Sequence, residues 1–273
     1  MKEALALLAL LLLLVPSSVE AQSGTSAGDA QYHLSSLSQN AGNGIVVINT
    51  GVEKDFPEQA AFTLEAQSSS DIVDVRLCYR VDKMSHVDVV SEGRAEFVRG
   101  TTIEAVWVWD MTNASLPPGA GVTYWWLIED ASGSRLVTSP EIMRFDDNRY
   151  MWQSLTSSGF LEECDISEVV EVTILWYQGA SSFVQELMNA CEEGIMRLTT
   201  DIGACPERPI RIYIYASTDD LKGAMIFPQE WTGGVAYTEF STIAIGIPPS
   251  RLSWGKRALV HELTHLVVHQ ATY

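Results

Sequence analysis

Short apolar runs separated by turn-forming clusters dominate the first half of the chain. From Gly44 to about Phe145, several of these runs alternate apolar with polar positions, which is typical of half-buried β-strands. The separating clusters include Ser68-Ser-Ser70 and Pro117-Pro-Gly119. The predicted strands are Ile45–Ile48, Ala61–Glu65, Val73–Val81, Ala95–Val98, Ile103–Trp109, Val122–Ile128 and Leu136–Thr138. Seven short strands in about 100 residues predict an immunoglobulin-like or fibronectin-like β-sandwich over residues 44–147.

The second half of the chain mixes strand and helix periods, and Phe145–Arg149 marks the boundary. The pattern predicts a strand, an amphipathic helix, a strongly alternating strand and then a hairpin. In order, these elements are Glu171–Tyr177, Ser182–Thr200, Ile210–Tyr215, and the hairpin of Gly233–Tyr237 with Ser241–Ile247. Ser217 is predicted to cap a short helix before the hairpin. This order predicts a mixed α/β layer over residues 148–273.

A last helix is predicted from about Ser253, and it carries the chemistry. Its apolar residues Leu259, Leu263, Leu266 and Val267 form one stripe for packing. On another face, His261, Glu262 and His265 spell H-E-x-x-H, a two-histidine zinc motif with a glutamate inside it. Residues four apart on a helix rise by about 6 Å and turn by about 40°, so both imidazoles can converge on one Zn²⁺ ion. The alternative is a buried helix whose histidines only make core hydrogen bonds.

The N-terminus predicts export. Lys2 precedes an apolar run, Ala4–Val15, and Ala21 offers a small residue for cleavage, so residues 1–21 are expected to be a signal peptide. The run is too short for a bilayer span, and no membrane span is expected after cleavage. Residues 22–43 are rich in Gly, Ser and Gln and predict a flexible linker. The protein is therefore expected to be secreted or extracytoplasmic, at the cell surface.

The acidic composition of the chain limits the kinds of partner that it can bind. Seventeen Lys and Arg stand against 35 Asp and Glu, a net charge of −18, which argues against nucleic acid and anionic membrane surfaces as partners. In an exported chain the four cysteines could pair in three ways, and we expect at most one bridge, among Cys164, Cys191 and Cys205. Cys78 lies in a strand-like run and is expected to be a buried free thiol.

The last part of the chain resembles a known family. The runs I-R-I-Y-I-Y, G-G-V-A-Y, I-A-I-G-I-P-P and H-E-L-T-H-L-V-V-H-Q-A-T look like the peptidase MA-like proteins of the gluzincin zinc metallopeptidases. The resemblance implies a zincin-like fold, with His261 and His265 as zinc ligands and Glu262 as general base. It also implies an edge strand before the helix that holds a peptide or protein substrate by strand addition. We assign that role to Thr242, Ile243, Ala244 and Ile245.

The resemblance also implies a third ligand, a glutamate on a later helix. Only eight residues follow His265 and none is acidic, so the zincin-like domain is expected to be incomplete at its C-terminus, and a missing tail could carry an anchor. His269 lies about 12 Å along the helix from His261, too far to share the ion, and is expected to pack or to support the site. Glu230 or Glu239 could approach from the hairpin.

Two functions stay open. The first is a secreted zinc metallopeptidase, with the activity of this chain in doubt because the third ligand is missing. The second is a non-catalytic surface protein that binds through the sandwich, with a degenerate zincin domain. In that second case Trp107 with Trp109, and Tyr124 with Trp126, would form sugar-stacking pairs. Otherwise these rings fill the sandwich core.

Overall fold

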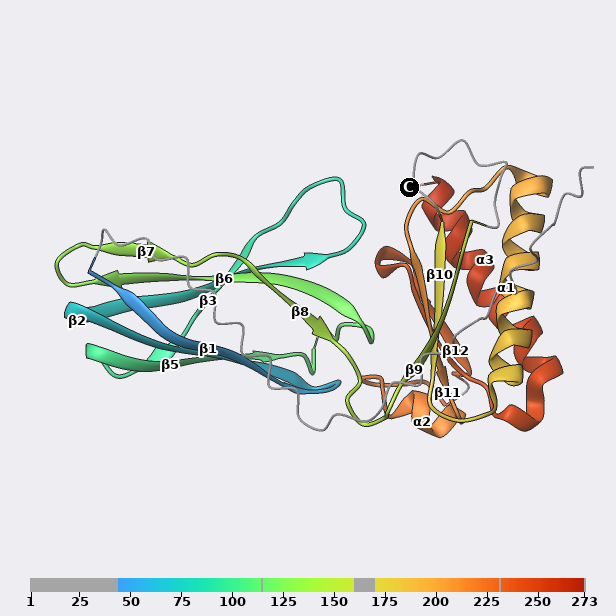
Figure 1. The fold of residues 1–273 in the computed structure, drawn as a ribbon, viewed down its shortest axis with the longest axis horizontal. Coiled ribbons are helices and arrows are strands. Elements are labelled where there is room, and N and C mark those ends of the chain that lie inside the picture. Colours follow the sequence, from blue (N-terminus) through green and yellow to red (C-terminus); the bar gives the residue numbers. More distant parts are fainter. Residues whose placement is uncertain (1–43, 114, 160–169, 231, 273) are drawn as a thin grey trace, which may run out of the picture. The chain divides into compact units, whose positions relative to one another are not determined.

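The computed structural model describes residues 44–113, 115–159, 170–230 and 232–272. The predicted signal peptide (1–21), the predicted linker (22–43) and Cys164 lie outside the described residues. Within these ranges the chain is mostly β-structure, arranged in two sheets, with long helices only in the second half (Figure 1). The combination of a β part with an α/β part is as predicted.

Eight strands of the described ranges form the first sheet, and every pairing in it is antiparallel. They are β1 (Val46–Asp55), β2 (Gln59–Asp82), β3 (Ser91–Arg94), β4 (Glu96–Phe97), β5 (Gly100–Asp110), β6 (Ala120–Asp130), β7 (Arg135–Val137) and β8 (Glu141–Phe145). The sequence pattern predicts most of these strands, but it misses β3 and β8, which are short, and β3 has no large apolar residue.

The long strand β2 organises this sheet. Its first part pairs with β1 and β5, and its second part, from Ile72, pairs with β6. The predicted break at Ser68–Ser70 is therefore wrong, because the chain stays extended there. The Ser68 hydroxyl donates to the buried carboxylate of Asp130 at 2.7 Å, which satisfies both groups inside the protein.

The aromatic residues of the first sheet divide into two groups. Tyr124 and Trp126 are buried in its core, as the packing alternative predicts. Trp107 and Trp109 are only partly buried, and both rings pack against Tyr79, with centroid distances of 5.3 and 4.5 Å. The sugar-stacking alternative therefore applies only to this second group.

Five strands of the described ranges form the second sheet, in the order β12-β13-β11-β10-β9. Their bounds are β9 (Gln153–Ser158), β10 (Glu171–Trp176), β11 (Ile210–Tyr215), β12 (Gly234–Tyr237) and β13 (Thr242–Gly246). The helices are α1 (Ser181–Ile202), α2 (Thr218–Lys222) and α3 (Leu252–Thr272), with 3₁₀ turns η1 (Thr238–Phe240) and η2 (Pro249–Arg251). The three inner strands run parallel and the two edge strands antiparallel to them.

Helices α1 and α3 cover one face of this sheet (Figure 1). The strand β11 carries buried side chains on both faces of this sheet. Its isoleucines, such as Ile212, point into the core shared with α1 and α3, whereas Tyr213 and Tyr215 point to the opposite face and join the core of the first sheet. Alternation along one strand therefore serves two cores.

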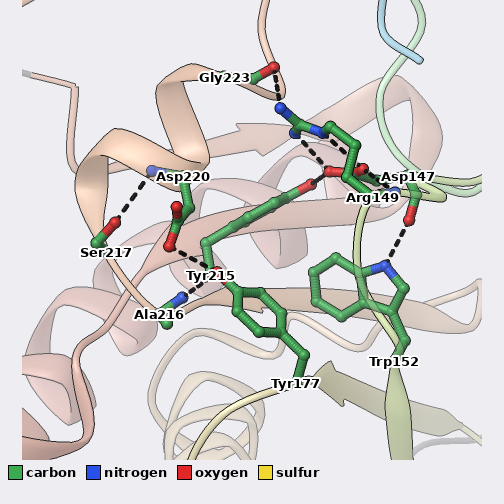
Figure 2. A network of polar contacts seen from close by, with 9 residues as sticks. All are labelled: Asp147, Arg149, Trp152, Tyr177, Tyr215, Ala216, Ser217, Asp220 and Gly223. Carbon is green, nitrogen blue, oxygen red and sulfur yellow. Dashed lines mark hydrogen bonds and ion pairs between the residues drawn. The ribbon is translucent and has the colours of Figure 1, made fainter. Parts of the chain in front are cut away.

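A buried polar network fixes the segment between the two sheets (Figure 2). The carboxylate of Asp147, with no exposed surface, accepts hydrogen bonds from Arg149 and from the hydroxyl of Tyr215 at 3.0 Å. Arg149 also donates to the carbonyl of Gly223 at 2.7 Å, and Trp152 donates to the carbonyl of Asp147 at 2.7 Å. The segment after β8 is thus tied to β11 and to the end of α2 through hydrogen bonds.

The state of the cysteines in the described residues can be compared with the prediction. Cys78 is buried and free, as predicted, and Cys191 is buried and free as well, whereas Cys205 is disulfide-bonded. Burial raises the pKa of the Cys191 thiol, which makes it an unreactive core residue.

In the ranges that the structure describes, no helix is both long and apolar enough to cross a bilayer.

Candidate active site

The helix α3 is set on the sheet by its apolar stripe. It follows Pro248 and the 3₁₀ turn η2, and the predicted residues Leu259, Leu263, Leu266 and Val267 are all fully buried. Because this stripe faces the sheet, the opposite face of the helix is open, and His261 and His265 are both exposed on it. The alternative of a buried pair of core histidines is therefore wrong.

The two imidazoles converge. Their Nε2 atoms lie 3.2 Å apart, and the rings are perpendicular with centroids 4.7 Å apart. Two nitrogens bound tetrahedrally to one zinc ion at about 2.05 Å would be about 3.4 Å apart. The observed separation is close to that value, so this pair fits two adjacent positions of a tetrahedral metal.

Glu262 lies beside the pair and borders an open groove. This groove, of about 580 Å³, runs between α3 and the strand β12, and its lining includes Glu262, His265, His269, Gly234 and Ala236. The carboxylate of Glu262 lies so close to β12 that one of its oxygens would be 3.2 Å from a methyl group placed on Gly234. The carboxylate, one ring of the histidine pair and a strand edge therefore meet in one groove.

The structure corrects the predicted substrate strand. Thr242, Ile243, Ala244 and Ile245 do not form an edge, because β13 lies between β12 and β11 and all its residues are buried. The edge strand beside the helix is β12, Gly234–Tyr237. The sequence contained a signal for this order: T-I-A-I-G is an unbroken run of small and apolar residues, which is typical of a strand covered on both faces.

The open side of β12 presents backbone groups for pairing. The amide of Gly246 donates to the carbonyl of Gly233 at 3.0 Å, so these two residues form a hydrogen-bonded pair. Pairing alternates along an antiparallel ladder, and therefore the N–H and C=O groups of Gly234 and Ala236 point away from β13. An extended peptide could accept and donate hydrogen bonds there.

No third ligand joins the histidines within the described ranges. Among those residues, no group of three His, Cys, Asp or Glu side chains is placed to hold one metal ion, so His269, Glu230 and Glu239 do not complete the pair. Glu239 is instead engaged elsewhere, by an ion pair with Lys83 at 2.8 Å. The described site consists of two nitrogen ligands and one neighbouring carboxylate.

Comparison with known families finds a match for the C-terminal part of the chain. Residues 190–273 match the family described as the peptidase MA superfamily, so this part of the chain is peptidase MA-like. The match covers α3 with its histidine pair, the edge strand β12 and most of the second sheet. A search of curated proteins found no significant match.

Three solved structures illustrate distant likenesses to this chain. The aminopeptidase A of Legionella pneumophila, solved with aspartic acid, is 10% identical with a TM-score of 0.34, over 82% of this chain and 34% of that one. OgpA from Akkermansia muciniphila is 9% identical with a TM-score of 0.29, over 37% of this chain and 27% of that one. A β-1,3-glucan binding domain of carbohydrate-binding module family 56 is 18% identical with a TM-score of 0.22, over 35% of this chain and 96% of that one. The chain thus spans about a third or less of either of the first two proteins.

Proposed function

With residues 190–273 placed in the peptidase MA superfamily, we propose that this protein is a zinc-dependent peptidase that hydrolyses peptide bonds in an exported location. The observation that carries the proposal is the 3.2 Å separation of the His261 and His265 Nε2 atoms on an open helix face. The fold assignments are part of the same proposal. The second sheet with α1 and α3 is taken as zincin-like, and the antiparallel first sheet as an immunoglobulin-like unit.

His261 and His265 would hold the metal through their Nε2 atoms. Zinc, when bound, supplies a Lewis acid that acidifies water and polarises a carbonyl group. The third protein ligand is not among the described residues, and we expect the two histidines by themselves to bind zinc weakly. Weak binding and slow turnover are consequences of the proposal and can be measured.

Glu262 is the general base in this proposal. It takes a proton from the water whose oxygen attacks the peptide carbon, and it delivers that proton to the departing amine nitrogen as the C–N bond breaks. The products are a carboxylic acid and an amine, so atoms and charges balance. The position of Glu262 in the groove, beside the open edge of β12, is what supports this role.

The strand β12 would hold the substrate. The N–H and C=O groups of Gly234 and Ala236 face the open side of the sheet, on the same side of α3 as Glu262. A peptide added as a further antiparallel strand would pass the carboxylate and leave its side chains alternately in the groove and in solvent. This mode favours extended, unfolded segments over compact proteins as substrates.

The test compares the full chain with Glu262→Gln in zinc binding and in hydrolysis of unfolded protein and peptide mixtures. We expect Glu262→Gln to keep its zinc and to lose at least about 100-fold in rate, the contribution of a general base. Glu193→Gln is the matched control, because Glu193 is an exposed glutamate on α1 and lies outside the groove. Equal hydrolysis by the wild type and Glu262→Gln, or no zinc bound by either, would refute the proposal.

A second candidate function is glycan binding by the first sheet without catalysis. The observation that favours it is the partly exposed cluster of Tyr79, Trp107 and Trp109, since flat aromatic faces can stack on sugar rings. It predicts that the full chain is retained on insoluble polysaccharide, that Trp109→Ala abolishes retention, and that His261→Ala does not. No retention of the wild type excludes this candidate.

A further inference from the structure

We infer that Gly234, at the start of the edge strand β12, is a positioning residue for Glu262. The inference rests on the proposed peptidase function. A methyl group at position 234 would lie 3.2 Å from both Cγ and one carboxylate oxygen of Glu262, and 3.1 Å from Cγ1 of Ile245. Such contacts are tighter than ordinary van der Waals contact, so the glutamate can occupy its place because position 234 has no side chain.

The two neighbours of this position differ in freedom. Ile245 is almost fully buried in the core under α3, where close packing restricts its movement. Glu262 is half-buried, borders the open groove and ends in a flexible chain of single bonds. Adding a methyl group at position 234 would therefore displace the Glu262 carboxylate and leave the core in place.

Backbone conformation does not explain this glycine. Among the described residues, the glycines with positive φ are Gly44, Gly119, Gly133, Gly159, Gly179 and Gly203, and Gly234 is not one of them. A residue with a side chain could adopt its backbone angles. What position 234 requires is space beside the carboxylate.

The preceding residue provides a built-in comparison. A methyl group on Gly233 would meet only the ring of Trp254, at 3.8 to 4.0 Å, which is ordinary contact. Gly233 also lacks a positive φ and lies outside the groove lining. The two adjacent positions are therefore both glycine, but only position 234 lies close to the Glu262 side chain.

For the reaction, the relevant distance is the one between the Glu262 carboxylate and a peptide bond of a substrate paired with β12. The backbone groups of Gly234 point to the open edge where a substrate strand would pair, and the Glu262 carboxylate lies directly beside them. Gly234 therefore lets the base approach the peptide bond closely, and a displacement of about 1 Å in such an arrangement can cost about 100-fold in rate.

The test compares Gly234→Ala with Gly233→Ala in the full chain. We expect Gly234→Ala to lower kcat about 10- to 100-fold with KM and zinc affinity changed less than about threefold, and Gly233→Ala to leave all three near wild type. A second readout does not depend on activity. The ¹³C carboxyl resonance of Glu262, identified by its loss in Glu262→Gln, should move in Gly234→Ala and stay in Gly233→Ala, in the metal-free protein at one pH.

The outcomes separate this inference from the proposed function. An unmoved Glu262 resonance in Gly234→Ala, or equal effects of the two alanines, overturns the positioning role. If the wild type shows no hydrolysis, the proposed function fails, and the resonance still decides where the carboxylate lies. Should Gly234→Ala fail to fold, Gly234→Ala/Ile245→Ala is compared with Ile245→Ala, which removes the contact on the strand side.

Discussion

Asp147 and Arg149 form a two-point ion pair, with Nε bonded to Oδ1 at 2.8 Å and Nη2 to Oδ2 at 2.6 Å. The carboxylate is completely buried, whereas the guanidinium is about one-third exposed, at 34% of its side-chain surface. The same guanidinium lies 5.4 Å from the ring centre of Tyr150. The pair holds the segment that leads from the first sheet to β9.

Replacing Arg149 by alanine should destabilise the protein by about 2–4 kcal/mol, because a buried carboxylate loses its charged partner. The hydroxyl of Tyr215 and the backbone amide at position 149 still donate to Asp147 in this variant, so the cost stays below that of an isolated buried charge. Urea unfolding measures the difference. The control is Arg80→Ala, whose exposed pair with Asp88 should contribute less than about 1 kcal/mol, and equal losses would contradict this account.

Asp130 should make stability depend on pH. Hydrogen bonds from the hydroxyl of Ser132, then from that of Ser68, hold the pKa of Asp130 below its ordinary value of 3.8. A lowered folded pKa means that folding favours the ionised form. The stabilisation is therefore complete above the unfolded pKa and is lost as the pH falls through 3.8 towards the folded pKa.

Unfolding free energies of the wild type and Asp130→Asn, measured from about pH 6 down to about pH 2.5, check this prediction. The wild type should be the more stable at the upper end, and the difference should shrink at the lower end. Asp201→Asn, on the exposed surface of α1, should follow the wild type throughout. A constant difference between the wild type and Asp130→Asn would show that the carboxylate contributes only through packing.

Strong local signals made much of the second half predictable. The strand β11 has the predicted bounds, α1 differs from prediction by at most two residues at either end, and Ser217 caps α2 by accepting a hydrogen bond from the amide of Asp220 at 3.0 Å. The face of α3 that carries His261 and His265 was also predicted, because an apolar stripe determines which face is left open.

Other features depend on partners distant in sequence. The strand β9, Q-S-L-T-S-S, is mostly polar and becomes a strand by pairing with β10 at the edge of the sheet. The predicted hairpin is present, but the edge was assigned to the wrong one of its strands, although the apolar run of β13 indicated an inner strand. The role of Gly234 was missed because its close neighbour Glu262 is 28 positions away.

Gly255 shows how closely α3 approaches the sheet. A methyl group at this position would lie 2.3 Å from Cγ2 of Ile247, which is fully buried. Gly255→Ala should gain up to about 1 kcal/mol in helix propensity and lose about 1–3 kcal/mol by overpacking, so that the protein becomes less stable. Ile247→Ala removes the clashing group. The double variant should therefore be more stable than the sum of the two single effects by about 0.5–3 kcal/mol, and additivity would place the strain elsewhere.

The last prediction concerns zinc binding by His261 and His265. His261→Ala and His265→Ala should each lower zinc affinity at least about 100-fold, because either change removes one of two converging nitrogens. His269→Ala should lower zinc affinity less than about tenfold, since His269 lies about 12 Å along the helix from His261 and can only support the site indirectly. Competition with a chromophoric chelator near neutral pH measures all three, with circular dichroism to confirm folding. If His269→Ala is as damaging as His261→Ala, the metal does not rest on the pair seen here, and α3 must bend or bind the ion in another way.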